Sequence, residues 1–247
     1  MARTPLTFMA WLRWDLIHRA LRDVAPGATL VEFGAGLGAL GARLAEVYDY
    51  TAVEPDPTSA AVARARVGPV GGRVVVGTDQ DLDTPEPVDV VCAFEVLEHF
   101  EDDEAVLRAW AGRLRPGGRI VLSVPAGPHR MGSHDELVGH YRRYDREELH
   151  RKLAGAGLVD VRVGCYGWPL GYALEWARNR AARRRLRSPE VVHEAMAART
   201  ASSGRTLQPP AVLGWVTWLV TRPFRAIQAR TVDSDRGIGY VVDATRP

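Results

Sequence analysis

Short apolar segments alternate with segments of helical periodicity along the first half of the chain, and this alternation limits its fold more than any other feature. Five segments have the length and apolar content of buried strands, at residues 29–33, 50–53, 73–76, 88–94 and 120–124. Helical spacing of apolar residues occurs between them, at residues 40–47, 57–66 and 102–114. Strands separated by helices predict an α/β fold with a doubly wound, mostly parallel sheet. Ligands bind such sheets at the carboxyl ends of the strands.

Further elements extend this pattern at both ends. Residues 8–24 have helical spacing, residues 145–156 form a second helical segment with Asp145 as its N-cap, and residues 159–166 and 239–244 are strand-like. Seven strands are therefore expected, with about 70 residues between the last two. We expect a core made of residues 1–167 plus 237–247. Residues 168–236 are expected to form a helical insertion rich in Arg and Trp.

The predicted insertion differs from the rest of the chain in charge. It holds 12 Arg and 5 acidic residues, against 20 basic and 25 acidic residues elsewhere, and four of the seven Trp. Its segment 212–229 is helix-like, with a break expected at Pro223. Trp with Arg on an amphipathic segment favours a peripheral membrane contact, or recognition of a lipid-like or anionic acceptor. The alternative is a helical cap with a solvated basic face. Nucleic acid is not expected as a partner, because the net charge is only +2.

Composition and cysteine usage favour a cytoplasmic protein. The chain has 247 residues, of which 46% are hydrophobic and 25% charged, as in ordinary globular proteins. Its two cysteines, Cys92 and Cys165, lie in apolar strand-like segments and are predicted to be buried thiols. No secretory signal is recognised at the N-terminus, and the longest apolar run, residues 212–220, is shorter than the about 20 residues that span a bilayer. A location at the membrane periphery is the alternative.

A glycine-rich turn follows the first predicted strand. Glycines there let the backbone approach a ligand, and Gly36-Leu37-Gly38-Ala39-Leu40-Gly41 also fits the dinucleotide pattern. Glu32, two residues before Gly34, distinguishes a dinucleotide site from a site for another ligand. An acid would repel a pyrophosphate, whereas it suits a ligand that carries an ammonium or sulfonium group.

Four ordered segments resemble the motifs of class I S-adenosylmethionine-dependent methyltransferases. The first is Val31-Glu32-Phe33-Gly34-Ala35-Gly36-Leu37-Gly38, and the second is Val53-Glu54-Pro55-Asp56. The others are Val88-Asp89-Val90-Val91, leading to Glu95-Val96-Leu97-Glu98-His99-Phe100, and Leu114-Arg115-Pro116-Gly117-Gly118-Arg119-Ile120. The resemblance covers residues 8–167, with the last strand near 239–244, and implies a Rossmann-like seven-stranded sheet that binds S-adenosylmethionine. It also implies that the first helix, with Trp11, Arg13 and Trp14, acts as a lid over the cofactor; core packing of the two Trp is the alternative.

The resemblance also implies which residues contact the cofactor. Glu54 would bind both ribose hydroxyls, since a carboxylate offers two acceptor oxygens. Family members usually place an acid directly after the third strand. Here Asp79 would take that role after a one-residue shift, or the backbone near Gln80 would. The predicted cofactor contacts are Glu32, Gly34, Ala35, Gly36, Gly38, Glu54, Pro55, Asp79, Gln80, Glu95, Val96 and His99.

The segment after the fifth strand holds the predicted acceptor site. Ser133-His134-Asp135-Glu136 and Gly139-His140-Tyr141-Arg142-Arg143-Tyr144 resemble a signature of a bacterial branch of the family. A His beside an Asp can be held in one tautomer and made more basic, so His134 is the predicted general base, with Asp135 and Tyr141 beside it. The predicted acceptor contacts are Trp14, His140, Arg142, Arg143 and Tyr144.

Structural roles are the alternatives for these residues. His134 could pack in a loop, Arg142 and Arg143 could pair with nearby acids, and Trp14 and His99 could belong to the core. His129, His134, Asp135 and His140 lack the spacing of a metal site, so no metal is predicted.

These observations predict a methyltransferase acting on a small-molecule or lipid-linked acceptor. O-methylation is favoured, as in natural-product tailoring or envelope biosynthesis. The alternatives are an NAD-dependent oxidoreductase, which Glu32 disfavours, and a catalytically silent methyltransferase-like binding protein. The acceptor and the oligomeric state do not follow from the sequence.

Overall fold

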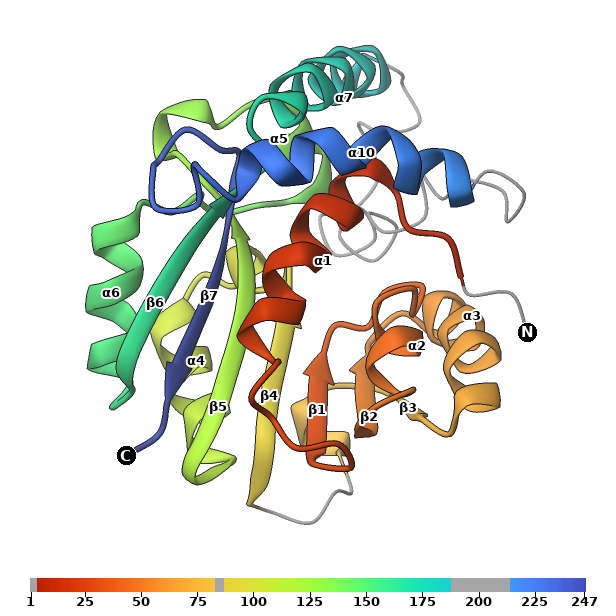
Figure 1. The fold of residues 1–247 in the computed structure, drawn as a ribbon, viewed down its shortest axis with the longest axis vertical. Helices are drawn as coiled ribbons and strands as arrows, with labels where there is room; N and C mark the ends of the chain where they lie inside the picture. Colours follow the sequence, from red (N-terminus) through yellow and green to blue (C-terminus); the bar gives the residue numbers. More distant parts are fainter. Residues whose placement is uncertain (1–3, 83–86, 188–213) are drawn as a thin grey trace.

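The computed structural model describes residues 4–82, 87–187 and 214–247, and these form one seven-stranded sheet covered by helices (Figure 1). The strands are β1 (Thr29–Phe33), β2 (Asp49–Glu54), β3 (Arg73–Val76), β4 (Val88–Phe94), β5 (Leu114–Pro125), β6 (Val159–Tyr166) and β7 (Gly239–Thr245). Their order is β3-β2-β1-β4-β5-β7-β6. All pairs from β3 to β5 are parallel, and β7 runs antiparallel to both β5 and β6. The predicted doubly wound, mostly parallel α/β sheet is confirmed.

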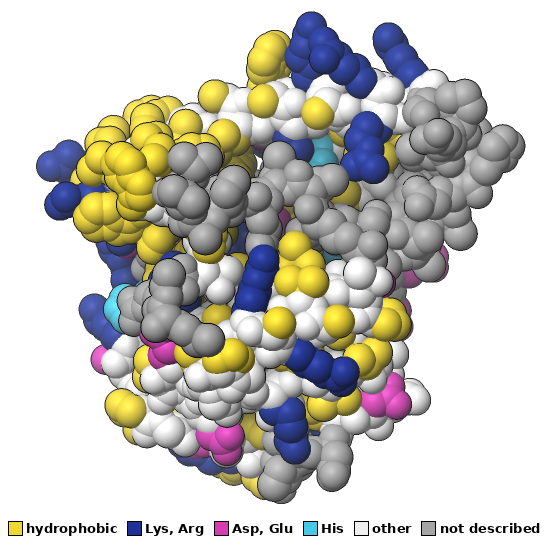
Figure 2. Space-filling model, turned by 90° about the vertical axis from the view of Figure 1, so that its right-hand side faces the viewer, with side chains coloured by type: hydrophobic (Ala, Val, Ile, Leu, Met, Phe, Trp, Pro, Cys, Tyr) yellow, Lys and Arg dark blue, Asp and Glu magenta, His cyan; other side chains and the backbone are white. Residues whose placement is uncertain are grey.

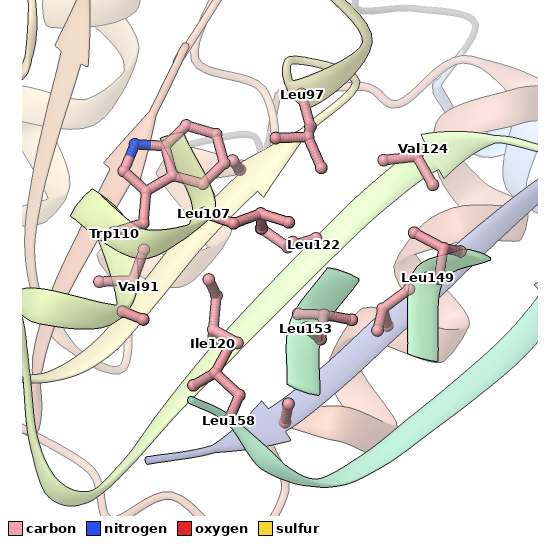
Figure 3. Close-up of a cluster of buried hydrophobic side chains, with 14 of the residues drawn as sticks. Val91, Leu97, Leu107, Trp110, Ile120, Leu122, Val124, Leu149, Leu153 and Leu158 are labelled. Atoms are coloured by element: carbon pink, nitrogen blue, oxygen red, sulfur yellow. The ribbon is translucent and has the colours of Figure 1, made fainter. Parts of the chain in front are cut away.

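Helices cover both faces of the sheet. The helices α1 (Phe8–Ala20), α2 (Gly41–Leu44) and α3 (Pro57–Val67) pack on one face. On the other face lie α4 (Asp103–Gly112) and α6 (Arg146–Gly155), whose apolar side chains meet those of β4 and β5 (Figure 3). The two predicted core thiols are buried. Cys92 lies in the core on the α1 face of the sheet, and Cys165 lies in the core on the α4 and α6 face.

Predicted and observed elements differ mainly where contacts between distant residues determine the bounds of a helix or strand. β5 begins at Leu114, six residues earlier than predicted, because Leu114 pairs with Val88 before the register shifts. The helix α5 (Ser133–Val138) forms within a segment expected to be a loop. The predicted break at Pro223 is wrong, because α10 (Gly214–Gln228) continues through it. Pro223 removes the hydrogen bond to the carbonyl of Leu219, and that residue is exposed, so water can replace the lost donor.

The predicted insertion contributes two described helices, α7 (Leu170–Leu186) and α10, while residues 188–213 lie outside the described part. α7 packs against α5, and α10 packs against α1. Figure 1 shows α5, α7 and α10 at the end of the sheet toward which β1 points, which is the carboxyl end of the parallel strands. The insertion boundaries at 167 and 237 stay a prediction. Among the helices formed by the described residues, none is long and apolar enough to cross a membrane.

Polar contacts join α10 to the first helix. The Trp11 indole nitrogen donates to the Thr217 hydroxyl at 3.2 Å, and the Gln228 side chain donates to the Leu12 carbonyl at 2.9 Å. Gln228 and Thr217 are both buried. The predicted lid helix is therefore fixed by the C-terminal helix, about 200 residues later in the chain.

Candidate active site

The glycine-rich turn after β1 folds through three glycines in the left-handed region. Gly34, Gly36 and Gly38 have φ angles of 75°, 52° and 72°. A Cβ on Gly34 would lie 2.5 Å from the Val96 side chain, and one on Gly38 would lie 2.8 Å from the Ala63 backbone. At Gly36, in contrast, no described atom lies within 4 Å of that position. The turn thus packs tightly at its two ends and leaves its centre accessible to a ligand.

Glu54 holds the centre of this turn from the end of β2. Its buried carboxylate accepts hydrogen bonds from the backbone N–H of Gly36 at 2.7 Å and of Asp56 at 3.0 Å. Asp56 caps α3 by accepting from Ser59, while Pro55 is exposed. The structure therefore brings together the two predicted cofactor contacts, Glu54 and Gly36, although they are 18 residues apart.

Glu32 is buried one residue before the end of β1. Its carboxylate accepts a hydrogen bond from the Tyr50 hydroxyl at 2.6 Å. Burial raises the pKa of Glu32 to about 7, and the nearby Glu54 adds to this, while Tyr50 and Arg13 act against it. A carboxyl group in such surroundings gains from a cationic ligand, because added positive charge favours its ionised form.

The residues after β3 form a short 3-10 helix, η2 (Asp79–Asp81). Asp81 caps it, accepting from the backbone N–H and the hydroxyl of Thr78. Asp79 is partly buried and Gln80 is exposed. The Arg113 guanidinium donates to the Asp79 carbonyl at 2.8 Å and fixes the backbone there. Asp81 is engaged in the cap, whereas the Asp79 carboxylate is not part of it, and an adenine contact of Asp79 stays a prediction.

Glu95 follows β4 with a φ of 59°, which is unusual for a residue other than glycine. Its carboxylate accepts from the hydroxyls of Ser123 and Tyr166 and lies 3.6 Å from the Arg13 guanidinium. Burial raises the pKa of Glu95, but Arg13, His140, Arg178 and the Ser123 hydroxyl together outweigh this and hold it below its usual value. The sequence resemblance places Arg13 in the lid helix with Trp11 and Trp14 but assigns it no contact. Its pairing with Glu95, on another element, was missed.

A second group of side chains lies next to Glu95. Glu98 is 0% exposed, and neither of its carboxylate oxygens has a hydrogen-bond partner among the described residues. The Nε2 atom of His140 lies 3.7 Å from one of these oxygens, and the rings of His99 and His140 meet edge to face at 4.7 Å. Burial and the nearby Glu95 raise the pKa of Glu98 well above its usual value. Burial also lowers the pKa of His99 to about 4.

Glu98 is the second residue that sequence reasoning missed. It lies in the 3-10 helix η3 (Leu97–His99), directly after β4. The segment Glu95-Val96-Leu97-Glu98-His99 places two acids and a histidine at the carboxyl end of a buried strand. That spacing was the available signal, since such strand ends are where ligands bind.

Asp135 contacts His140 rather than His134, so the predicted orientation of His134 by Asp135 is wrong. One Asp135 oxygen lies 2.8 Å from Nδ1 of His140, and the carboxylate also accepts two bonds from the Arg143 guanidinium. The backbone N–H of Gly132 donates to it as well. Asp135 lies in the first turn of α5, so its side chain turns back toward the start of that helix.

His134 has a different environment from the one its sequence suggests. Its backbone N–H donates to the Asn179 side chain on α7 at 2.9 Å. Burial lowers the pKa of His134 to about 3, and the nearby Arg178 contributes. The expected increase in basicity is therefore wrong, and the role of His134 as general base stays a prediction.

Three predicted acceptor contacts are engaged within the protein. Arg143 is buried between Asp135 and Glu175, and Arg142 lies 3.1 Å from Asp103. The Tyr144 hydroxyl donates to Asp103 at 2.9 Å, and its ring is fully buried. Arg143 and Tyr144 thus have partners inside the protein, and their contact with the acceptor stays a prediction. Arg142 pairs with Asp103, which agrees with the alternative that it pairs with a nearby acid.

The remaining predicted residues lie at the margin of the site. Tyr141 is 52% exposed, and its backbone N–H donates to the Glu98 carbonyl. Trp14 is partly buried on α1 and stacks on His18 at 5.9 Å. Ala35 donates its N–H to Val53 within the glycine-rich turn. His129 is exposed and apart from the group formed by Glu98, His99 and His140.

Comparison with known proteins gives a consistent assignment. A family model described as a methyltransferase domain matches residues 7–163. A ubiquinone biosynthesis O-methyltransferase of Xanthomonas campestris is 34% identical over 48% of this chain and 51% of its own length. A probable S-adenosylmethionine-dependent methyltransferase of Mycobacterium tuberculosis is 32% identical over 58% of this chain and 50% of its own. The chain thus spans about half the length of these curated relatives.

Solved structures resemble the chain in fold. One is a phosphoethanolamine N-methyltransferase of Haemonchus contortus in complex with S-adenosylmethionine, with a TM-score of 0.59 and 18% identity over 95% of this chain and 52% of its own. Another is a possible histamine N-methyltransferase of Thermotoga maritima, with a TM-score of 0.57 and 18% identity over 95% of this chain and 93% of its own. At this identity the likeness concerns the fold alone.

Proposed function

We propose that this chain, which belongs to the class I S-adenosylmethionine-dependent methyltransferases, transfers a methyl group to a small-molecule or lipid-linked acceptor. The observation that carries the proposal is the contact between the Glu54 carboxylate and the Gly36 amide, at the one glycine of the turn that leaves room for a ligand. S-adenosylmethionine supplies the methyl group on a sulfonium. The protein contributes by positioning the acceptor and excluding water.

The residues at the strand ends contact different parts of the cofactor. Glu54 accepts hydrogen bonds from the ribose hydroxyls, and Asp79 contacts the adenine amino group. Glu32 and Glu95 give the methionine end a negative environment, and both are buried or partly buried. Arg13 and Tyr50 hold these two carboxylates in place.

An oxygen acceptor is favoured, since ubiquinone biosynthesis O-methyltransferases are among the relatives. A lipid-linked acceptor is supported by the surface of α10, where Trp215 is 66% exposed and Trp218, Leu219 and Val220 are exposed as well. Figure 2 shows hydrophobic side chains gathered at the upper left of one face, with Lys and Arg side chains at their margin. Arg222 lies over the Trp218 ring at 5.1 Å. Trp and Arg together are typical of segments that lie at a membrane interface.

Calorimetry with S-adenosylmethionine and with NAD tests the cofactor. We expect binding of S-adenosylmethionine alone. Glu54→Ala should weaken it by about 100-fold, because each hydrogen bond to a carboxylate contributes about 1.5 kcal/mol or more. Glu136→Ala removes the same charge from the exposed part of α5 and should leave the affinity unchanged. Binding of NAD without S-adenosylmethionine would favour the oxidoreductase, and binding without turnover on any acceptor would favour a silent protein.

Two measurements address the acceptor. Mass spectrometry of candidate phenols, alcohols and amines incubated with the cofactor would detect the addition of one methyl group. Co-sedimentation with vesicles of anionic lipid should decline as salt is added, and Trp215→Ser with Trp218→Ser should reduce it. Sedimentation that is absent at low salt would remove the membrane contact from the proposal.

A further inference from the structure

The proposed function gives no cofactor contact to Glu98, His99 or His140, although the sequence resemblance places His99 among the predicted contacts. Each residue offers one ligand atom, and these atoms lie within 4.8 Å of one another. Both Glu98 oxygens and the Nδ1 atom of His99 are buried without a hydrogen-bond partner among residues that the structure describes. Buried polar groups are almost always paired in native proteins, so unpaired atoms facing one another indicate a missing occupant.

Asp135 prepares His140 for such an occupant. The Nδ1 atom of His140 lies 2.8 Å from a carboxylate that also accepts from Arg143, so Nδ1 carries the proton and donates it to Asp135. The lone pair of His140 is then on Nε2, the atom 3.7 Å from Glu98. A carboxylate that holds the far nitrogen of a histidine is the arrangement found behind metal-binding histidines.

We propose that Glu98, His99 and His140 bind a divalent first-row transition metal ion such as Mn²⁺ or Zn²⁺. One carboxylate and two imidazoles favour these ions over Mg²⁺, which prefers oxygen ligands alone. Two ligand atoms about 2.1 Å from one ion lie at most about 4.2 Å apart. The 3.7 Å separation of Glu98 and His140 already meets this limit, and a small closure brings in His99.

The ion would bind the acceptor hydroxyl and make it more acidic. Three protein ligands leave coordination positions open, and a hydroxyl bound there loses its proton more readily. The bond from the acceptor oxygen to the methyl carbon forms as the carbon–sulfur bond breaks, the sulfur takes the electron pair, and the hydroxyl proton leaves to water. This catalytic part rests on the proposed function, whereas the binding of the ion does not.

The test measures the ion on the full chain, without cofactor or acceptor. After removal of metals with a chelator, Mn²⁺ or Zn²⁺ is added, and the bound ion and the melting temperature are measured. We expect about one ion per chain and a higher melting temperature. Glu98→Gln and His140→Asn should each weaken binding by 100-fold or more. Metal-free Glu98→Gln should melt close to the metal-free wild type, because Gln matches Glu98 in size and the substitution breaks no hydrogen bond to either carboxylate oxygen.

His129→Ala provides the control, since this exposed histidine precedes α5 and lies apart from the group. It should bind the ion as the wild type does. Absence of binding to the wild type, or equal binding by Glu98→Gln, would overturn the proposal and indicate that a proton alone occupies the group. If the ion binds but S-adenosylmethionine does not, the proposed function fails while the metal site stands. If only the cofactor binds, the reverse holds.

Discussion

The proposed cofactor side and the proposed acceptor side of the site are built in different ways. On the cofactor side, between β1 and the start of α3, the backbone makes most of the contacts, as in the bond from the Gly36 amide to Glu54. On the acceptor side, side chains from separate elements make them, as where Asp135 of α5 and Glu175 of α7 share Arg143. A site made from backbone turns can be recognised in sequence, whereas one made from long-range side-chain pairs cannot.

The largest expected effect is on the acceptor side. Asp135→Asn leaves the buried Arg143 with one carboxylate fewer and should lower the free energy of unfolding by about 3 kcal/mol or more. Arg162→Ala breaks the Asp243 pair, whose Arg162 side chain is 60% exposed, and should cost less than about 1 kcal/mol. Urea unfolding of both variants gives the comparison. Equal losses would show that the buried network is not what holds this side together.

The stability deficit of Asp135→Asn should also depend on pH. Burial raises the pKa of Asp135, but His140 and Arg143 outweigh this and hold it well below its usual value of 3.8. A carboxyl with a lowered pKa stabilises the fold fully above its unfolded-state pKa and loses that contribution as the pH falls through the folded value. The deficit of Asp135→Asn should therefore be constant above about pH 5 and shrink in stronger acid.

The next effect concerns Glu32, a buried carboxyl on the cofactor side. Burial raises the pKa of Glu32 from 4.5 to about 7. Between these values the folded protein keeps a proton that the unfolded chain has lost, so Glu32 lowers stability as the pH rises through this window. Glu32→Gln can still accept from Tyr50. It should be more stable than the wild type by about 3 kcal/mol at pH 8, and by much less at pH 5.

Unfolding of cofactor-free protein at both pH values measures this difference. An advantage that does not grow with pH would mean that Glu32 is ionised in the folded state. The cofactor side would then tolerate a buried charge as the acceptor side does, and the contrast between the two sides would narrow.

The smallest effects separate two glycines of the turn. Gly38→Ala places a Cβ 2.8 Å from the Ala63 backbone and should cost about 2 kcal/mol or more of stability, from overpacking and from its left-handed φ. Gly36→Ala meets no described atom, so only the backbone conformation, about 1 kcal/mol, opposes it. Gly36→Ala should instead lower the affinity for S-adenosylmethionine, measured by calorimetry. Unchanged affinity would place the cofactor elsewhere.

Much of the fold could be predicted, because strand length, apolar runs and turn residues are local. The bounds of β1, β3, β4 and β6 match the predicted segments. The additional start of β5 at Leu114 could not be predicted, since it depends on pairing with Val88. The predicted break at Pro223 rests on the local preference of proline against helices, and the packing of α10 on α1 outweighs that preference.

The acceptor side shows the limit of local reasoning. Asp135 is next to His134 in sequence, but in a helix adjacent side chains point away from each other. Asp135 therefore meets His140, which lies beyond the end of α5. In the same way, Arg143 and Tyr144 have partners, Glu175 and Asp103, that come from other elements.

The position of β7 between β5 and β6 sets the order in which the molecule can assemble during synthesis. The strands β1 to β4, with the glycine-rich turn, can pair as soon as they leave the ribosome. β6 has β7 as its neighbour in the sheet, and so it joins the other strands once residues 239–245 have been made. Until then β5 presents an unpaired edge, the kind of surface through which chains aggregate. A nascent chain thus acquires its cofactor turn early and completes the support of its acceptor side late.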